Sequence, residues 1–163
     1  MSLLDLIKPH IRDLAPYEPG KPIEELEREL GIRESIKLAS NENPLGASPK
    51  AVEAMRRSLD EVNRYPDGAS FALRSALASR LGVAENQLVF GCGGDEILEW
   101  IAKTVIGPGD EVVYGLPSFA MYPIVIQGMG ARGVPVPLTD EFTQDLDAMA
   151  AAVFWPISRT TSW

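Results

Sequence analysis

One short segment constrains the fold more than any other. The apolar run 87–90 is followed directly by the glycine-rich turn Gly91–Gly94, and residues 95–105 then carry apolar side chains at helical spacing. Glycines let a backbone approach a ligand closely. The N-terminus of the following helix offers unpaired N–H groups and the positive end of a dipole. This strand–turn–helix order therefore predicts a seat for a phosphate group.

The turn lacks the signatures of nucleotide-binding loops. No Gly-Lys-Ser/Thr follows it, which excludes a Walker A loop. Glu96 stands where a dinucleotide fingerprint has its third glycine. A single phosphate on a smaller cofactor remains, and so does the alternative of an ordinary tight turn with Asp95 as its helix cap.

The rest of the chain alternates between helical and strand patterns, which is typical of an α/β fold with a largely parallel sheet. Helices are predicted over 22–31, 48–59, 69–81, 95–105 and 143–153, and residues 123–127 fit the start of another. Strands are predicted over 36–39, 87–90, 111–114 and 133–138. In the last helix we expect Thr143 to be the cap and Leu146, Met149 and Val153 to point inward.

Composition excludes several classes of protein. The 163 residues correspond to about one domain. Fifteen Lys and Arg against 23 Asp and Glu give a net charge of −8, which argues against nucleic-acid and anionic-membrane partners. The single Cys92 and single His10 exclude a disulfide framework and a Cys/His zinc site, so no metal site is predicted. We expect Cys92 to be a small buried residue of the turn.

The same features indicate a location. A lone cysteine fits a reducing cytoplasm. No apolar run approaches the roughly 20 residues of a membrane helix, and the N-terminal residues do not have the pattern of a signal peptide. We therefore expect a cytoplasmic protein without a membrane partner.

Taken together, several segments resemble the histidinol-phosphate aminotransferase family. They are YEPGKP (17–22), IKLASNENPLGASP (36–49), RYPDG (64–68), GCGGDEIL (91–98) and PGDEVVYGLPSFAMY (108–122). The resemblance covers residues 5–153 and implies part of the pyridoxal-phosphate transferase fold of the aspartate-aminotransferase type. It implies an N-terminal arm and part of a small domain over 1–60, and the first part of the large cofactor-binding domain over 61–153. Residues 154–163 resemble nothing in the family.

The resemblance also implies roles by position. Gly94, Asp95 and Glu96 match the turn whose backbone N–H groups hold the phosphate of pyridoxal 5'-phosphate. Phe119 matches the aromatic residue that stacks on the pyridine ring. Tyr65 matches a tyrosine that reaches the cofactor phosphate of the neighbouring subunit, which implies a homodimer.

Three further positions match residues that the family uses for its small-molecule substrate. They are Tyr17, Asn43 and Gly46. Each position named for cofactor or substrate has a plainer explanation as well: core packing for Phe119, and turn chemistry for Tyr65, Asn43 and Gly46.

The family's activity is amino transfer between glutamate and imidazole-acetol phosphate in histidine biosynthesis. The lysines of the chain are Lys8, Lys21, Lys37, Lys50 and Lys103, and none of them matches the family's Schiff-base lysine. We therefore assign no catalytic residue and expect the chain alone to be inactive. Residues 154–163 are interpreted as a frameshifted or foreign tail.

Several alternatives stay open at this point. One is another enzyme of the superfamily, a threonine-phosphate decarboxylase or an aromatic aminotransferase. Another is a non-catalytic phosphate-binding or dimerisation module, and a third is a product without function. Because strands of the family's sheet are missing from this chain, we also expect exposed apolar edges and poor stability or association.

Overall fold

The computed structural model describes residues 3–153. These residues form two compact units. Unit 1 joins residues 3–17 to 91–153, and unit 2 comprises residues 18–90. The two units are defined by contacts within this chain, whereas the predicted boundary at residue 60 separates domains of the family's fold. That boundary therefore stays a prediction.

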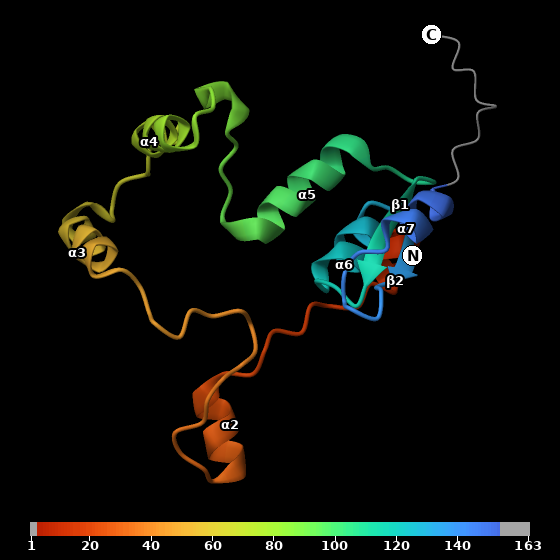
Figure 1. The fold of residues 1–163 in the computed structure, drawn as a ribbon, viewed down its shortest axis with the longest axis horizontal. Coiled ribbons are helices and arrows are strands. Elements are labelled where there is room, and N and C mark those ends of the chain that lie inside the picture. Colours follow the sequence, from red (N-terminus) through yellow and green to blue (C-terminus); the bar gives the residue numbers. More distant parts are fainter. Residues whose placement is uncertain (1–2, 154–163) are drawn as a thin grey trace. The chain divides into compact units, whose positions relative to one another are not determined.

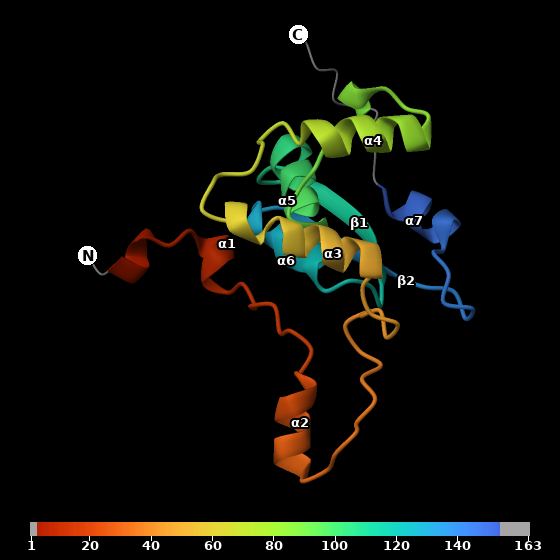
Figure 2. The same cartoon turned by 90° about the vertical axis from the view of Figure 1, so that its left-hand side faces the viewer.

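Unit 1 is built on a parallel pair of strands, β1 (Glu111–Leu116) and β2 (Arg132–Pro137), which run side by side in Figures 1 and 2. The helix α6 (Met121–Gly128) connects them and packs against β2. The remaining elements of unit 1 are the 3₁₀ helix η1 (Leu3–Leu6) and the helices α1 (Pro9–Arg12), α5 (Gly93–Val105) and α7 (Leu146–Ala152). Both strands predicted for this region are confirmed, as is the helix predicted to start near 123.

Side chains on both faces fix the register of the pair, in which Glu111 is the partner of Arg132. The Arg132 Nε–H donates to a Glu111 carboxylate oxygen at 2.7 Å. The Tyr114 ring lies over Gly133, where an added Cβ would be 3.0 Å from a ring carbon. Gly115 is buried beneath the amide of Gln144. The two glycines therefore make room for neighbouring side chains.

The last helix, α7, has a different N-cap residue from the predicted one, so a different set of side chains faces inward. Its N-cap is Asp145, whose carboxylate accepts the Ala148 N–H at 2.9 Å, and Thr143 instead bonds Thr139 within the preceding turn. This cap turns Ala148, Met149 and Ala152 inward. Leu146 and Val153 are exposed, so their predicted inward orientation is wrong.

Unit 2 contains helices and connecting segments. Its elements are α2 (Ile23–Leu30), α3 (Pro49–Arg57), η2 (Leu59–Glu61), α4 (Phe71–Leu81) and η3 (Glu85–Gln87). Gly31 and Gly82 end α2 and α4 in the left-handed conformation, as the sequence predicts. The three predicted helices of this unit are confirmed, with α4 beginning at Phe71.

Two predicted strands of unit 2 do not form. Residues 36–39 and 88–90 lie outside any hydrogen-bonded ladder in the described part of the chain, and Gln87 belongs to η3. An apolar run has the propensity for a strand, but a strand needs a partner for its N–H and C=O groups. Leu38 is accordingly 95% exposed.

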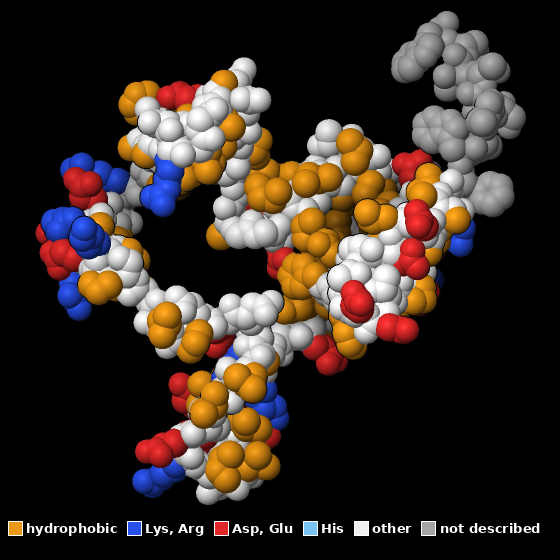
Figure 3. All heavy atoms as spheres, in the orientation of Figure 1, with side chains coloured by type: hydrophobic (Ala, Val, Ile, Leu, Met, Phe, Trp, Pro, Cys, Tyr) orange, Lys and Arg blue, Asp and Glu red, His pale blue; other side chains and the backbone are white. Residues whose placement is uncertain are grey.

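The described residues bury few apolar side chains. The buried apolar residues are Ala78, Ala102, Ile126 and Val136. Many large apolar residues face solvent, among them Ile36, Leu45 and Phe71, and Figure 3 shows hydrophobic side chains on the visible surface of α2. No helix within residues 3–153 is long and apolar enough to cross a membrane.

Such exposure predicts association. Because the free energy falls when apolar surface leaves water, the apparent mass of the purified chain should rise with its concentration in sedimentation-velocity runs. The midpoint of thermal unfolding should depend on concentration as well. A sharp, reversible and concentration-independent transition of a monomer would contradict this prediction.

A second prediction concerns Asp67, which lies three residues before Ser70, the N-cap of α4, and binds the first N–H group of the helix. Its carboxylate accepts the N–H of Phe71 at 2.8 Å and of Ala69 at 3.0 Å, and these bonds lower the pKa of the Asp67 carboxyl, the Phe71 bond most. The stabilisation is present above the carboxyl's ordinary pKa, about 4, and is lost as pH falls through the lowered value. Asp67→Ala should therefore reduce helical circular dichroism at neutral pH.

The control is Asp60→Ala, which removes an exposed carboxylate from η2 of the same unit. The difference between wild type and Asp67→Ala should vanish at low pH, while Asp60→Ala should resemble wild type throughout. An Asp67→Ala deficit that persists unchanged after the Asp67 carboxyl of the wild type is fully protonated would contradict the role of this carboxylate at the start of α4.

Candidate functional site

The glycine-rich turn forms the N-terminus of α5, a helix of 13 residues. Gly93 has φ +83°, a conformation that favours glycine, and its N–H donates to the Gly91 carbonyl at 3.0 Å. A Cβ on Gly91 would lie 2.9 Å from the Ile97 side chain and 3.0 Å from the Glu96 carboxylate. Two of the glycines are therefore required by the local geometry itself.

Glu96 organises the turn through its side chain. Its carboxylate accepts the backbone N–H of Cys92, the N-cap residue of α5. The predicted alternative in which Asp95 caps the helix is therefore wrong: Asp95 lies inside the first turn. Cys92 is exposed rather than buried, because the N-cap stands at the open end of the helix.

The first turn of α5 leaves backbone donors available. Within the described residues, the N–H groups of Gly94 and Asp95 make no hydrogen bond, as is usual for the first positions of a helix. A Cβ on Gly94 would meet no atom within 4 Å, so the space in front of this residue is open. The turn thus offers two adjacent backbone donors.

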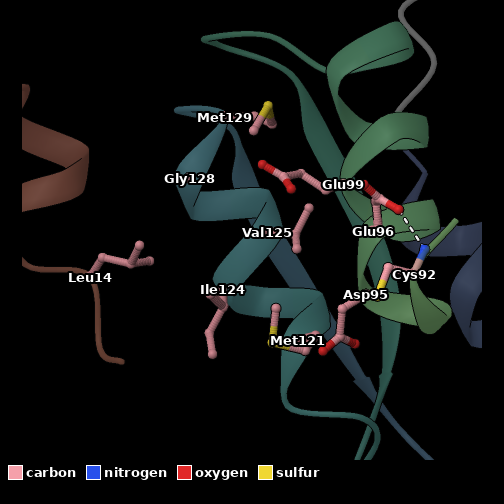
Figure 4. Close-up of a pocket in the computed structure, with 10 residues that line it drawn as sticks. All are labelled: Leu14, Cys92, Asp95, Glu96, Glu99, Met121, Ile124, Val125, Gly128 and Met129. Atoms are coloured by element: carbon pink, nitrogen blue, oxygen red, sulfur yellow. Dashed lines mark hydrogen bonds between the residues drawn. The ribbon is translucent and has the colours of Figure 1, made fainter. Parts of the chain in front are cut away.

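A hollow of about 450 Å³ lies beside this turn, between α5 and α6 (Figure 4). It is lined by Leu14, Cys92, Asp95, Glu96, Glu99, Met121, Ile124, Val125, Gly128 and Met129. Of the residues predicted to bind a cofactor, Asp95 and Glu96 line it, whereas Gly94 and Phe119 do not. Three of the lining residues are carboxylates, Asp95, Glu96 and Glu99, so the hollow itself does not suit an anionic group.

Phe119 follows the end of β1 and is held by Tyr122. The two rings meet edge to face, with centroids 6.1 Å apart and an interplanar angle of 84°. Phe119 is 44% exposed, so part of its ring surface is open to a ligand. The sequence analysis did not identify Tyr122 as its support, although the spacing of three residues at a helix start was the available signal.

The remaining predicted residues are not brought to the glycine turn by any described contact. Tyr17 belongs to unit 1 and is 45% exposed. Tyr65, in unit 2, is fully exposed at 102% relative accessibility. The roles in cofactor and substrate binding assigned to these two residues stay predictions.

Asn43 and Gly46 form a turn of their own in unit 2. The Asn43 carboxamide accepts the Leu45 N–H at 3.1 Å and donates to the Gly46 carbonyl at 3.0 Å. Gly46 has φ +77°. Turn chemistry therefore accounts for both residues locally, and their predicted contact with substrate stays a prediction.

Comparison with known proteins assigns the chain to a family. The family model described as aminotransferase class I and II matches residues 33–154. The chain belongs to this aminotransferase family. It is 52% identical over 153 residues to a histidinol-phosphate aminotransferase of Methylobacillus flagellatus, covering 93% of this chain and 41% of that relative. A histidinol-phosphate aminotransferase of Moorella thermoacetica is 52% identical over 143 residues, covering 88% and 37%.

Solved structures of aminotransferases share the fold. A crystal structure of histidinol-phosphate aminotransferase from Sinorhizobium meliloti in complex with pyridoxal-5'-phosphate superposes with a TM-score of 0.78 at 30% identity, covering 91% of this chain and 39% of that one. The α/β fold class predicted from the sequence, an incomplete part of the aminotransferase fold, is confirmed. The chain spans about two-fifths of the length of the curated relatives it matches.

The packing at Gly91 yields a prediction about stability. Gly91→Ala should destabilise unit 1 by about 1 kcal/mol, because the new methyl group displaces Ile97 and Glu96. Gly94→Ala, with open space at the same helix end, should be neutral or stabilising by up to about 1 kcal/mol through helix propensity. Urea unfolding followed by circular dichroism measures both, and equal effects of the two variants would contradict this account.

Proposed function

We propose that this chain forms the cofactor-phosphate end of a histidinol-phosphate aminotransferase. The observation that carries the proposal is the pair of unbonded N–H groups at Gly94 and Asp95, in the same turn that matches the family's phosphate site. The identity of about 50% to enzymes of that name supports the choice within the family. The reaction inferred is amino transfer between glutamate and imidazole-acetol phosphate.

The turn fits the phosphate of pyridoxal 5'-phosphate by its donors. The Gly94 and Asp95 amides suit a phosphate oxygen at the positive end of the α5 dipole. The partly exposed face of Phe119 suits a flat conjugated ring, which it would hold by stacking. When bound, the cofactor would supply an electron sink for the negative charge that develops at the α-carbon of the substrate. The chain's own residues would bind and orient it.

Other parts of the proposal depend on segments beyond the turn. The Schiff-base lysine is expected outside the 163 residues, so we infer that the chain alone binds the cofactor without catalysing transfer. The same proposal has three further parts. It includes a homodimer in which Tyr65 reaches the cofactor phosphate of the neighbouring subunit, and a cytoplasmic location. It also includes contacts with the substrate from Tyr17, Asn43 and Gly46.

A second candidate is a related aminotransferase with another substrate. The solved α-aminoadipate aminotransferase from Thermus thermophilus shares the fold with a TM-score of 0.51 at 26% identity. The glycine turn binds the cofactor and does not discriminate between amino acids, so it leaves this candidate open. A comparison of activities with imidazole-acetol phosphate and with α-keto acids as amino acceptors, in a full-length relative, would distinguish the two.

Binding of a cofactor analogue tests the proposal on this chain directly. Pyridoxamine 5'-phosphate is a suitable probe, because it has no aldehyde and cannot react with surface lysines. We expect saturable 1:1 binding in isothermal titration calorimetry, weakened about tenfold or more by Gly94→Asp, which places a negative charge at the phosphate seat.

The matched control is Gly68→Asp. An added Cβ at Gly68 also meets no atom within 4 Å, and the residue lies in unit 2, outside the glycine turn. Its variant should bind the probe like wild type. Absence of binding by the wild-type chain, or equal weakening by the two variants, would refute the proposed seat.

A further inference from the structure

Tyr122, in the first turn of α6, contacts Phe119 in two ways. The Phe119 ring needs such support, because residues 117–120 belong to no helix or strand. The Tyr122 ring meets it edge to face, with centroids 6.1 Å apart and planes at 84°. The Tyr122 backbone N–H also donates to the Phe119 carbonyl at 3.1 Å, which closes the turn that leads into the helix. Tyr122 therefore holds both the ring and the backbone of Phe119.

Tyr122 is itself supported by two other elements of unit 1. An apolar hollow of about 260 Å³ is lined by residues of α5, β1 and α6. Tyr122 lines it together with Leu98 and Ile101 of α5 and with Val112 of β1. The residue is 38% exposed, so most of its surface is covered. The side chain that contacts Phe119 thus stands where α6 packs against α5 and the first strand.

The same turn of α6 also borders the glycine turn. Met121, the residue before Tyr122, lines the hollow of Figure 4 together with Asp95. Because α5 is a continuous helix of 13 residues, its N-terminal amides and the side chains that line the second hollow belong to one rigid element. Tyr122 therefore connects Phe119 to the helix that presents the amides.

We propose that Tyr122 is a positioning residue that holds the Phe119 ring at a fixed place relative to the Gly94 and Asp95 amides. The inference rests on the proposed function, in which Phe119 stacks on the cofactor ring and the amides bind the cofactor phosphate. A small, rigid ligand gains most from two contacts when they are already correctly placed before it binds. An edge-to-face neighbour fixes the plane of the stacking ring as well as its place.

A double-mutant cycle tests this role with pyridoxamine 5'-phosphate as the probe in calorimetry. Tyr122→Leu keeps an apolar side chain in the hollow but removes the ring contact, so it should weaken binding about fivefold or more. Phe119→Leu should weaken binding at least as much. Adding Tyr122→Leu to Phe119→Leu should change the affinity less than about twofold, because Tyr122 acts through the Phe119 ring.

Conservative and control variants separate the ring contact from general packing. Tyr122→Phe should bind within about twofold of wild type, because the Tyr122 hydroxyl makes no hydrogen bond within residues 3–153. The matched control is Trp100→Leu. Trp100 is also 38% exposed, lies on α5 and lines neither hollow, so its variant should bind like wild type. If Tyr122→Leu loses helical circular dichroism, Tyr122→Met takes its place in the cycle.

Each other outcome is decisive. Equal weakening by Tyr122→Leu in the presence and absence of the Phe119 ring would show that Tyr122 acts through the fold alone, and overturns the inference. Binding by Tyr122→Leu like wild type, or by Tyr122→Phe as weakly as by Tyr122→Leu, overturns it as well. If Phe119→Leu binds like wild type, the inference falls while the phosphate seat stands. If the wild-type chain does not bind the probe, the proposed function fails, and this inference fails with it.

Discussion

The parallel pairing of β1 with β2 is the interaction on which unit 1 depends. It is the one hydrogen-bonded sheet within residues 3–153, and both α6 and α7 pack against it. The two strands are close in the chain, because the helix that connects them is only eight residues long, so closing the loop between them costs little entropy. Phe119 lies three residues beyond Leu116, the last residue of β1, in the connection that leads into α6.

Unit 2 lacks a comparable framework. The buried apolar residue of this unit, within the described range, is Ala78. Its helices are held by local caps, short ion pairs and the hydrogen bonds that Arg74 donates to the backbone. Asp67 at the start of α4 and the left-handed Gly82 at its end define that helix from within. Local interactions of this kind specify a helix well but do little to specify how helices pack.

This contrast explains what the sequence predicted and what it did not. Helix ends marked by Gly31 and Gly82 were predictable, because the left-handed conformation belongs to the residue itself. The strands at 36–39 and 88–90 were not, because pairing is a property of two segments. In the candidate site, the run of glycines predicted the open turn, but the bond from Cys92 to the Glu96 carboxylate depends on a rotamer that spacing does not reveal.

The turn at Asn43 has a consequence for any molecule that meets it. Its two side-chain bonds, together with the Gly46 N–H donated to the Asn43 carbonyl at 3.0 Å, hold the loop in one conformation from within. A loop that is ordered beforehand loses little conformational entropy when something binds to it. Even though its side chains face solvent, this segment of unit 2 would therefore lose less conformational entropy on binding than a loop without such internal bonds.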